Sequence, residues 1–210
     1  MKHIFFKPIK LRKFFCTLFL CLLCINIFLP KISLAASKEE VDNLISTIPM
    51  DIWPQAPDIA SEAGILIEPE SGTILYAKNA TEALYPASTT KLMTALLTLE
   101  NCSLEEVVTY SSTAVLSLEP GSSHIGLKVG EQLTVKDSLY GLLLPSANEV
   151  ANGLAEHVSG SISAFADKMN EKAASLGAVN THFANANGLH DDNHYTCAYD
   201  LALIMQACIQ

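Results

Sequence analysis

The sequence predicts an α/β protein of the α+β type, in which an N-terminal β-hairpin precedes a mostly helical region. Two β-rich runs at residues 64–68 and 73–77 flank a Pro-Glu-Ser-Gly turn at 69–72, which is the pattern of a hairpin. Amphipathic helical patterns then dominate the rest of the 210-residue chain. A hairpin of two strands is marginally stable on its own, so we expect it to belong to a larger antiparallel sheet.

The predicted helices follow from apolar spacing and from residues that start or stop a helix. Thr134 and Asp137 supply an N-terminal cap, and Gly160 and Gly177 are placed to end two helices. The helices are predicted at 89–100, 134–144, 149–158, 163–176 and 198–209, with a hairpin or loop at 121–130. The last pattern runs to Ile209 without a cap, so we expect that the chain is truncated and that C-terminal strands of the sheet are missing.

The first 36 residues are typical of a secretory signal peptide. Residues 1–13 are basic, residues 14–29 are almost purely apolar, and small residues follow at Ala35 and Ala36. The apolar run of sixteen residues is short for a membrane-spanning helix, although an uncleaved anchor stays an alternative. We therefore expect export from the cytoplasm, with a loose segment at 37–60 ahead of the globular part at 61–210.

Charge and ligand spacing disfavour two classes of protein. After the leader, the chain carries seven basic residues, none of them Arg, against 22 acidic ones. It therefore lacks the clustered positive charge that nucleic acids require. The three cysteines in this part show no zinc-ligand spacing. His190 and His194 flank a polar Asp-Asp-Asn stretch, which we interpret as a solvated loop, with a metal cluster as the minor alternative. We expect no nucleic acid, no metal and no cofactor.

Ser88 and Lys91 form a Ser-x-x-Lys pattern at the start of the first predicted helix. This spacing puts both side chains on one helix face, within reach of each other. The electropositive helix N-terminus and burial both disfavour the ammonium form, so Lys91 is suited to accept the proton of the Ser88 hydroxyl. Taken alone, the pattern is expected about once by chance in a chain of this length, and Ser88 is then simply an N-cap.

Ser146 and Asn148 follow Pro145 in a turn between two predicted helices. Residues of these types in turns usually satisfy local backbone groups. Each pattern nevertheless occurs once in the chain, and each lies where a loop meets a helix, so their side chains can line one cleft.

Both patterns extend into longer stretches that resemble a known family. Pro-Ala-Ser-Thr-Thr-Lys-Leu-Met-Thr at 86–94 and Leu-Leu-Pro-Ser-Ala-Asn at 143–148 are similar to the first two motifs of serine D-alanyl-D-alanine carboxypeptidases. These enzymes are low-molecular-mass penicillin-binding proteins, akin to class A β-lactamases. Residues 183–190 and 194–201 also resemble the family. The resemblance implies a β-lactamase/transpeptidase-like fold and makes 61–210 a partial catalytic domain.

The resemblance also implies a role for each candidate site residue. Ser88 would attack the carbonyl between the two terminal D-alanines of a peptidoglycan stem peptide, with Lys91 as its base. Ser146 would relay a proton to the leaving amine, and Asn148 would hold the substrate amide. β-Lactams would acylate Ser88 and stay bound, and the enzyme would work at the outer face of the membrane or in the cell wall, with membrane association.

The sequence departs from the family pattern in ways that keep two alternatives open. The family usually has Asp where this chain has Glu149, and its third motif, Lys-Thr-Gly, does not occur in the sequence. One alternative is a β-lactamase, although no Glu-x-x-x-Asn segment supplies a carboxylate for deacylation after Asn148. The other is a catalytically inactive, truncated product that binds the cell wall.

Overall fold

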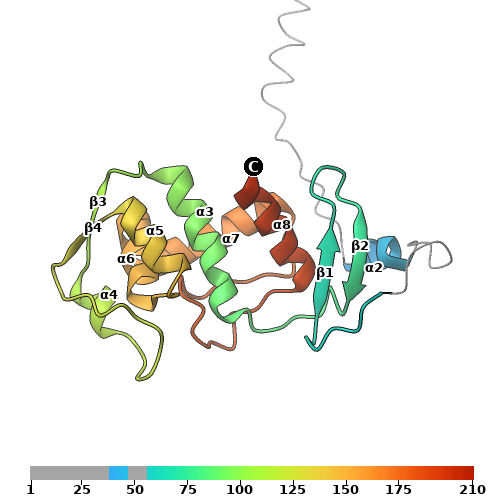
Figure 1. Ribbon diagram of the computed structural model, residues 1–210, viewed down its shortest axis with the longest axis horizontal. Helices are drawn as coiled ribbons and strands as arrows, with labels where there is room; N and C mark the ends of the chain where they lie inside the picture. Colours follow the sequence, from blue (N-terminus) through green and yellow to red (C-terminus); the bar gives the residue numbers. More distant parts are fainter. Residues whose placement is uncertain (1–37, 47–55) are drawn as a thin grey trace, which may run out of the picture. The chain divides into compact units, whose positions relative to one another are not determined.

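The computed structural model describes residues 38–46 and 56–210, which all belong to one unit that spans 35–210. The predicted signal peptide lies outside the described residues. In chain order the elements are α2 (Lys38–Ser46), β1 (Gly64–Ile67), β2 (Ile74–Lys78), the 3-10 helix η1 (Ala87–Thr90), α3 (Lys91–Asn101), β3 (Val107–Thr109), α4 (Ser112–Leu116), β4 (Gln132–Thr134), α5 (Val135–Leu143), α6 (Asn148–Ser159), α7 (Ile162–Leu176) and α8 (Ala198–Ile209). The mixed α/β architecture is confirmed (Figure 1).

The predicted hairpin is present and consists of β1 and β2. The two strands pair in antiparallel fashion, with Gly64 opposite Lys78. Gly72 in the turn has a φ of 71°, a conformation that glycine adopts without a steric penalty, and its N–H donates to the carbonyl of Glu68 at 2.9 Å. The turn chemistry read from the sequence therefore sets the register of the hairpin.

Four elements were not predicted: strands β3 and β4 and helices α2 and α4. Strands β3 and β4 pair with each other on either side of the loop that contains Gly121 and Gly130, where a hairpin or loop was expected. Each of these strands has three residues, which is too short for an alternating pattern to be recognised. Helices α2 and α4 were also missed. Helix α2 lies in the stretch expected to be loose, and its Val41 side chain is buried.

The main core of the described residues forms around α6. This helix contacts α3, α4, α5 and α7, and strand β3 as well (Figure 1). Its buried apolar side chains meet those of its neighbours in one cluster, which includes Met93, Leu96, Leu97, Val108, Tyr110, Leu142, Val150, Leu154, Phe165, Met169 and Ile204. Burial of these side chains is the dominant source of stability and fixes the ends of α3 and α6 relative to each other.

A close approach between Tyr110 and α6 explains one helical glycine. A Cβ atom on Gly153 would overlap the ring of Tyr110, so only glycine lets the ring lie against the helix. The Tyr110 hydroxyl donates to Ser138 Oγ at 2.7 Å, and burial raises the pKa of Tyr110 to about 12. The hydroxyl is therefore a neutral structural contact between β3 and α5.

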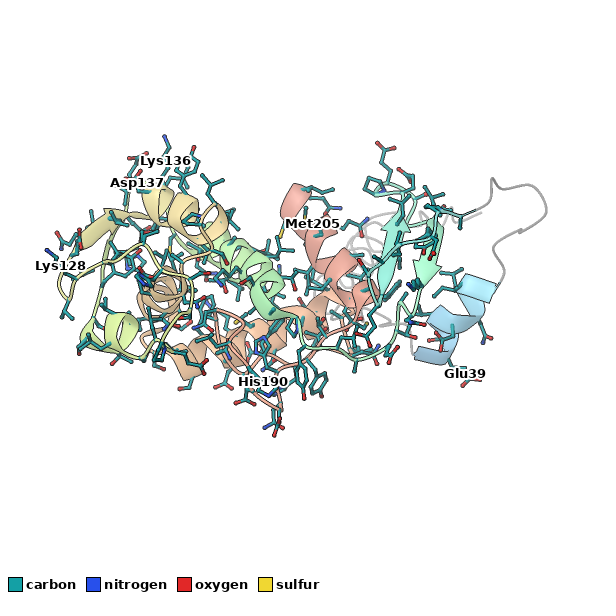
Figure 2. All side chains as sticks on the ribbon, turned by 60° about the horizontal axis from the view of Figure 1, so that its bottom comes forward. Glu39, Lys128, Lys136, Asp137, His190 and Met205 are labelled. Carbon is teal, nitrogen blue, oxygen red and sulfur yellow. The ribbon has the colours of Figure 1, made fainter. Side chains whose placement is uncertain are left out.

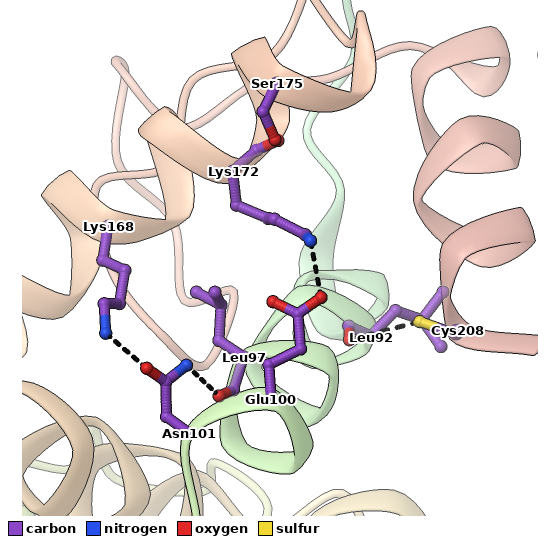
Figure 3. Close-up of polar contacts among 8 residues, drawn as sticks. All are labelled: Leu92, Leu97, Glu100, Asn101, Lys168, Lys172, Ser175 and Cys208. Atoms are coloured by element: carbon purple, nitrogen blue, oxygen red, sulfur yellow. Dashed lines mark hydrogen bonds and ion pairs between the residues drawn. The ribbon is translucent and has the colours of Figure 1, made fainter. Parts of the chain in front are cut away.

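Helix α3 is tied along one side to α7 and α8, as Figure 3 shows. Lys172 on α7 forms an ion pair with Glu100, and Lys168 donates to Asn101 Oδ1 at 2.7 Å. Cys208 on α8 donates weakly to the Leu92 carbonyl. These contacts, with the core beneath them, hold the helix whose first residue is Lys91.

An apolar groove of about 420 Å³ runs between β1 and α8. Ile65 and Ile67 line it from the hairpin, and Leu201 and Met205 line it from the helix. Figure 2 shows Met205 on α8, and this side chain is about half exposed. Within 38–46 and 56–210, none of the helices has the length and apolar character needed to cross a bilayer.

Candidate active site

Ser88 lies in the 3-10 turn η1, which leads directly into α3 at Lys91. The residue before it, Ala87, has a φ of 48°, which is unfavourable for a residue with a Cβ atom. Such backbone strain costs of order 1–3 kcal/mol and is found mostly where function requires it. The strained turn presents the Ser88 hydroxyl next to the Lys91 side chain.

The Lys91 ammonium group is buried among uncharged oxygen atoms. The residue is 2% exposed, and its Nζ atom lies 2.6 Å from the carbonyl oxygen of Asn187 and 2.8 Å from Oδ1 of Asn148. The third neighbour is Ser88 Oγ, at 3.3 Å. No carboxylate of the described residues pairs with Nζ, and burial lowers the pKa of Lys91 from 10.5 to about 8.

Ser146 contacts Ser88 from a second loop, the one that precedes α6. Its Oγ donates to Ser88 Oγ at 3.0 Å, across 58 residues of sequence. Like Ala87, Ser146 has a positive φ, 61°, so both loops that present the serines are locally strained. The Ser88 hydroxyl thus lies between the amine of Lys91 and the hydroxyl of Ser146.

Asn148 begins α6, and its position is secured by the residue after it. Glu149 is 1% exposed, and its Oε1 accepts N–H groups from Ile125 at 2.7 Å and Gly126 at 3.0 Å. The Asn148 N–H donates to the carbonyl of Ser123 at 2.9 Å. Glu149, which replaces the usual Asp of the family, therefore fastens the 123–126 loop to the start of α6, beside the site.

A loop that sequence reasoning left without a role completes the surroundings of Lys91. The Asn187 carbonyl accepts from Lys91, while its side chain is held by Asn152 at 3.0 Å and by the Leu189 N–H at 2.9 Å. Gly188 has a φ of 88°, and a Cβ atom there would overlap the Ala87 carbonyl. Glycine is therefore required for the loop to reach the strained turn before Ser88.

His194 locks the same loop onto the start of α3. Its Nδ1 accepts the Ala184 N–H at 3.0 Å, so Nε2 carries the proton and donates to Thr90 Oγ1 at 2.7 Å. The residue is 2% exposed, and burial lowers the pKa of His194 to about 4. The interpretation of His190 to His194 as a solvated loop is therefore wrong for His194, although His190 is exposed (Figure 2).

All four candidate site residues come together. Ser88, Lys91, Ser146 and Asn148 form one connected set of contacts. Sequence reasoning missed Asn187, because it contributes a backbone carbonyl and any residue has one. The Asn-Gly pair that ends in Gly188 was the available signal, since such a pair marks a turn with positive φ.

Comparisons with known proteins identify the family of the chain. Residues 50–210 match the family model of D-alanyl-D-alanine carboxypeptidases. The carboxypeptidase DacF of Bacillus subtilis is 40% identical over 157 residues, which are 73% of this chain and 40% of that protein. DacC of Escherichia coli is 36% identical over 74% of this chain and 41% of its own length. The chain thus spans about two fifths of the length of these relatives.

Solved structures share the fold of this chain. Penicillin binding protein 6B of Escherichia coli superposes with a TM-score of 0.70 at 32% identity, over 75% of this chain and 52% of that one. The Streptomyces K15 DD-transpeptidase gives a TM-score of 0.69 at 33% identity, over 74% and 63%. The predicted transpeptidase-like fold is confirmed. By sequence and by structure, the chain belongs to the D-alanyl-D-alanine carboxypeptidase family.

Proposed function

We propose that this chain carries the acylating residues of a penicillin-sensitive serine D,D-carboxypeptidase. The observation that carries the proposal is the position of Ser88 Oγ between Lys91 Nζ and Ser146 Oγ, at 3.3 and 3.0 Å. A serine hydroxyl is a weak nucleophile and needs a neighbouring base to remove its proton. Lys91, with a pKa of about 8, is neutral often enough near pH 7 to be that base.

The contacts of Lys91 also orient its lone pair. A neutral amine has two N–H bonds and one lone pair. The two shortest contacts of Nζ are to the oxygens of Asn187 and Asn148, which can only accept hydrogen bonds. Both N–H bonds therefore point to these oxygens, and the lone pair faces the Ser88 hydroxyl, the longest of the three contacts.

The proposed reaction follows from this geometry. Ser88 Oγ bonds to the carbonyl carbon between the two terminal D-alanines of a stem peptide, and its proton moves to Lys91. The C–N bond then breaks, the amine of the departing D-alanine takes the hydroxyl proton of Ser146, and the proton held by Lys91 replaces it. Water later hydrolyses the Ser88 ester. Asn148 would bind the substrate amide, and N–H groups at the start of α3 would stabilise the oxyanion.

We extend the proposal to location and partners. The basic, apolar and small-residue order of the first 36 residues supports export to the outer face of the membrane or the cell wall. The substrate would be a stem peptide that ends in D-Ala-D-Ala, and β-lactams would be inhibitors. Association with the membrane is part of the same proposal. Mass spectrometry of the mature N-terminus tests the cleavage, which is expected near Ala36.

Labelling with a fluorescent penicillin tests the function. It is applied to the 210-residue chain and to a chimera that continues into the C-terminal part of the Bacillus subtilis relative. We expect a stable label that Ser88→Ala abolishes and that Lys91→Ala or Ser146→Ala slows by roughly a hundredfold or more. Ser175→Ala is the matched control, because Ser175 also lies three residues from a lysine on a helix, but is exposed (Figure 3).

The outcomes separate the alternatives. A label that forms at Ser88 and is lost within seconds indicates a β-lactamase. A chimera that folds cooperatively but stays unlabelled contradicts the proposal and favours an inactive wall-binding protein. Release of D-alanine from a synthetic pentapeptide then distinguishes a carboxypeptidase from a protein that binds penicillin without turning over its peptide substrate.

A further inference from the structure

Three side chains of metal-binding types meet on the described part of the chain, away from Ser88. Cys102 directly follows α3, Glu106 lies in the next turn, and His157 is in the last turn of α6. One ligand atom from each of them lies within 4.8 Å of the other two. None of the three has a place in the proposed acylation chemistry.

The His157 imidazole and the Glu106 carboxylate already lie as far apart as two ligands of one metal ion. His157 Nε2 lies 3.2 Å from Glu106 Oε2. The other carboxylate oxygen, Oε1, accepts the Ser103 N–H at 2.6 Å, and the Glu106 carbonyl accepts from the Val135 N–H at 2.8 Å. The carboxylate is thus fixed at its backbone and at one oxygen, with the second oxygen directed toward the imidazole.

The set of donors has the chemistry of a zinc site. Thiolate, imidazole and carboxylate are the three side-chain ligands of Zn²⁺, at about 2.3, 2.0 and 2.0 Å. Tetrahedral angles at these lengths separate neighbouring ligand atoms by about 3.3–3.6 Å. The His157–Glu106 distance of 3.2 Å already fits this spacing, and the Cys102 thiol lies within 4.8 Å of both ligand atoms, so a change of its side-chain torsion would complete the set.

The local field also favours a cation. Cys102 caps the C-terminal end of α3, and His157 lies in the last turn of α6, so the negative ends of two helix dipoles meet here. Among the described residues, a positive charge close to Cys102 is Lys168, whose Nζ is bound to Asn101 Oδ1 at 2.7 Å (Figure 3). Lys168 is therefore held by a side chain outside the cluster.

We propose that Cys102, Glu106 and His157 bind one Zn²⁺ ion, with water as the fourth ligand. The Glu106 and His157 side chains are 45% and 23% exposed, so solvent reaches the fourth position. Such an ion joins the end of α3 to the end of α6, the two helices that begin with Lys91 and Asn148. It would stabilise the scaffold without taking part in the reaction, so this proposal is independent of the proposed function.

Cobalt and zinc binding by the full chain under reducing conditions test the site. With Co²⁺ in place of Zn²⁺, we expect a thiolate-to-metal charge-transfer band that Cys102→Ser removes. Competition with a chromophoric chelator should give one Zn²⁺ per chain, with an affinity that falls roughly tenfold or more in Cys102→Ser and in His157→Gln. Cys208→Ser and His190→Gln are the matched controls, because Cys208 and His190 lie outside the cluster.

The spectrum of the unaltered chain keeps the test valid even where a variant folds poorly. The absence of a cobalt–thiolate band in the unaltered chain overturns the proposal. So does Zn²⁺ binding that Cys102→Ser and His157→Gln leave unchanged, or that Cys208→Ser weakens equally. In those cases His157 and Glu106 form only a surface ion pair.

Discussion

The Nζ atom of Lys91 lies 2.8 Å from the Oδ1 atom of Asn148, and both residues are at least 95% buried. Among the described residues, the neighbours of Nζ are neutral oxygens rather than carboxylates, so no opposite charge offsets the desolvation of the ammonium form. An amide at this position thus orients the amine but stabilises the ammonium form less than a carboxylate would. The protonation state of Lys91 depends on residue 148 being an amide.

Asn148→Asp should therefore raise the pKa of Lys91. A carboxylate within 3 Å favours the ammonium form and shifts such a pKa by roughly 1–3 units. In the parent protein, the acylation rate should rise with pH and level off above about 8, as Lys91 loses its proton. In the variant, the rise should move to higher pH, and the rate at pH 7 should fall roughly tenfold or more. The measurement is the rate of penicillin labelling as a function of pH.

Asn101→Asp is the control for this change, because it puts a carboxylate next to a different lysine, Lys168. Its labelling profile should match that of the parent. A profile of Asn148→Asp that also matches the parent would show that Lys91 is not the titrating base.

The sequence predicted the elements that have a strong local signal. The hairpin was readable from its Pro and Gly turn, and the helices that end at Gly160 and Gly177 were readable from apolar spacing and stop residues. Both glycines have positive φ, 78° and 85°, as helix caps of this kind require. Helical spacing indicated that Ser88 and Lys91 can meet, and the resemblance of the flanking residues to a known family singled this pair out.

The features that the sequence did not predict depend on tertiary contacts. The burial of His194 and the contact of Asn187 with Lys91 both arise when the 184–194 loop packs against α3. Neither residue has a local pattern that distinguishes it from a solvated loop residue. Strands β3 and β4 are stabilised by pairing across 23 residues or more, so a three-residue window carries no signal for them.

Gly188→Ala should damage the site more than an ordinary glycine substitution. Positive φ alone costs an alanine about 1 kcal/mol, whereas at Gly188 the added Cβ also overlaps the Ala87 carbonyl. We expect the free energy of unfolding to fall by about 2 kcal/mol or more, and the labelling rate to fall roughly tenfold. Gly121→Ala is the control: its φ is 83°, but no atom lies within 4 Å of the added Cβ. Equal losses in both variants would contradict the close approach.

Glu149→Ala should destabilise the loop beside Asn148. The change removes the acceptor of the Ile125 and Gly126 N–H groups, whose hydrogen bonds are part-buried, so the free energy of unfolding should fall by roughly 1–3 kcal/mol in all. Glu149→Gln keeps one acceptor oxygen in place, so its free energy of unfolding should fall by less than that of Glu149→Ala. Urea unfolding gives the stabilities, and hydrogen exchange should accelerate at residues 125 and 126. Glu131→Ala, which removes an exposed acceptor of the Lys128 N–H, should lose no more than about 0.5 kcal/mol.

Acid should destabilise the protein through His194. Burial lowers the pKa of His194 from 6.5 to about 4 in the folded state, so between these values the unfolded chain binds a proton that the folded protein does not. The free energy of unfolding therefore falls as the pH falls from about 6.5 to about 4, by roughly 3 kcal/mol from this group. Above pH 6.5 the imidazole is neutral in both states and contributes no pH dependence. Urea unfolding at several pH values measures the effect against His194→Gln, in which this part of the slope should disappear because the titrating group is gone. His190→Gln changes an exposed position of the same loop and should leave the pH dependence of the free energy of unfolding as it is in the parent protein. If His194→Gln also keeps that pH dependence, groups other than His194 cause the loss of stability in acid.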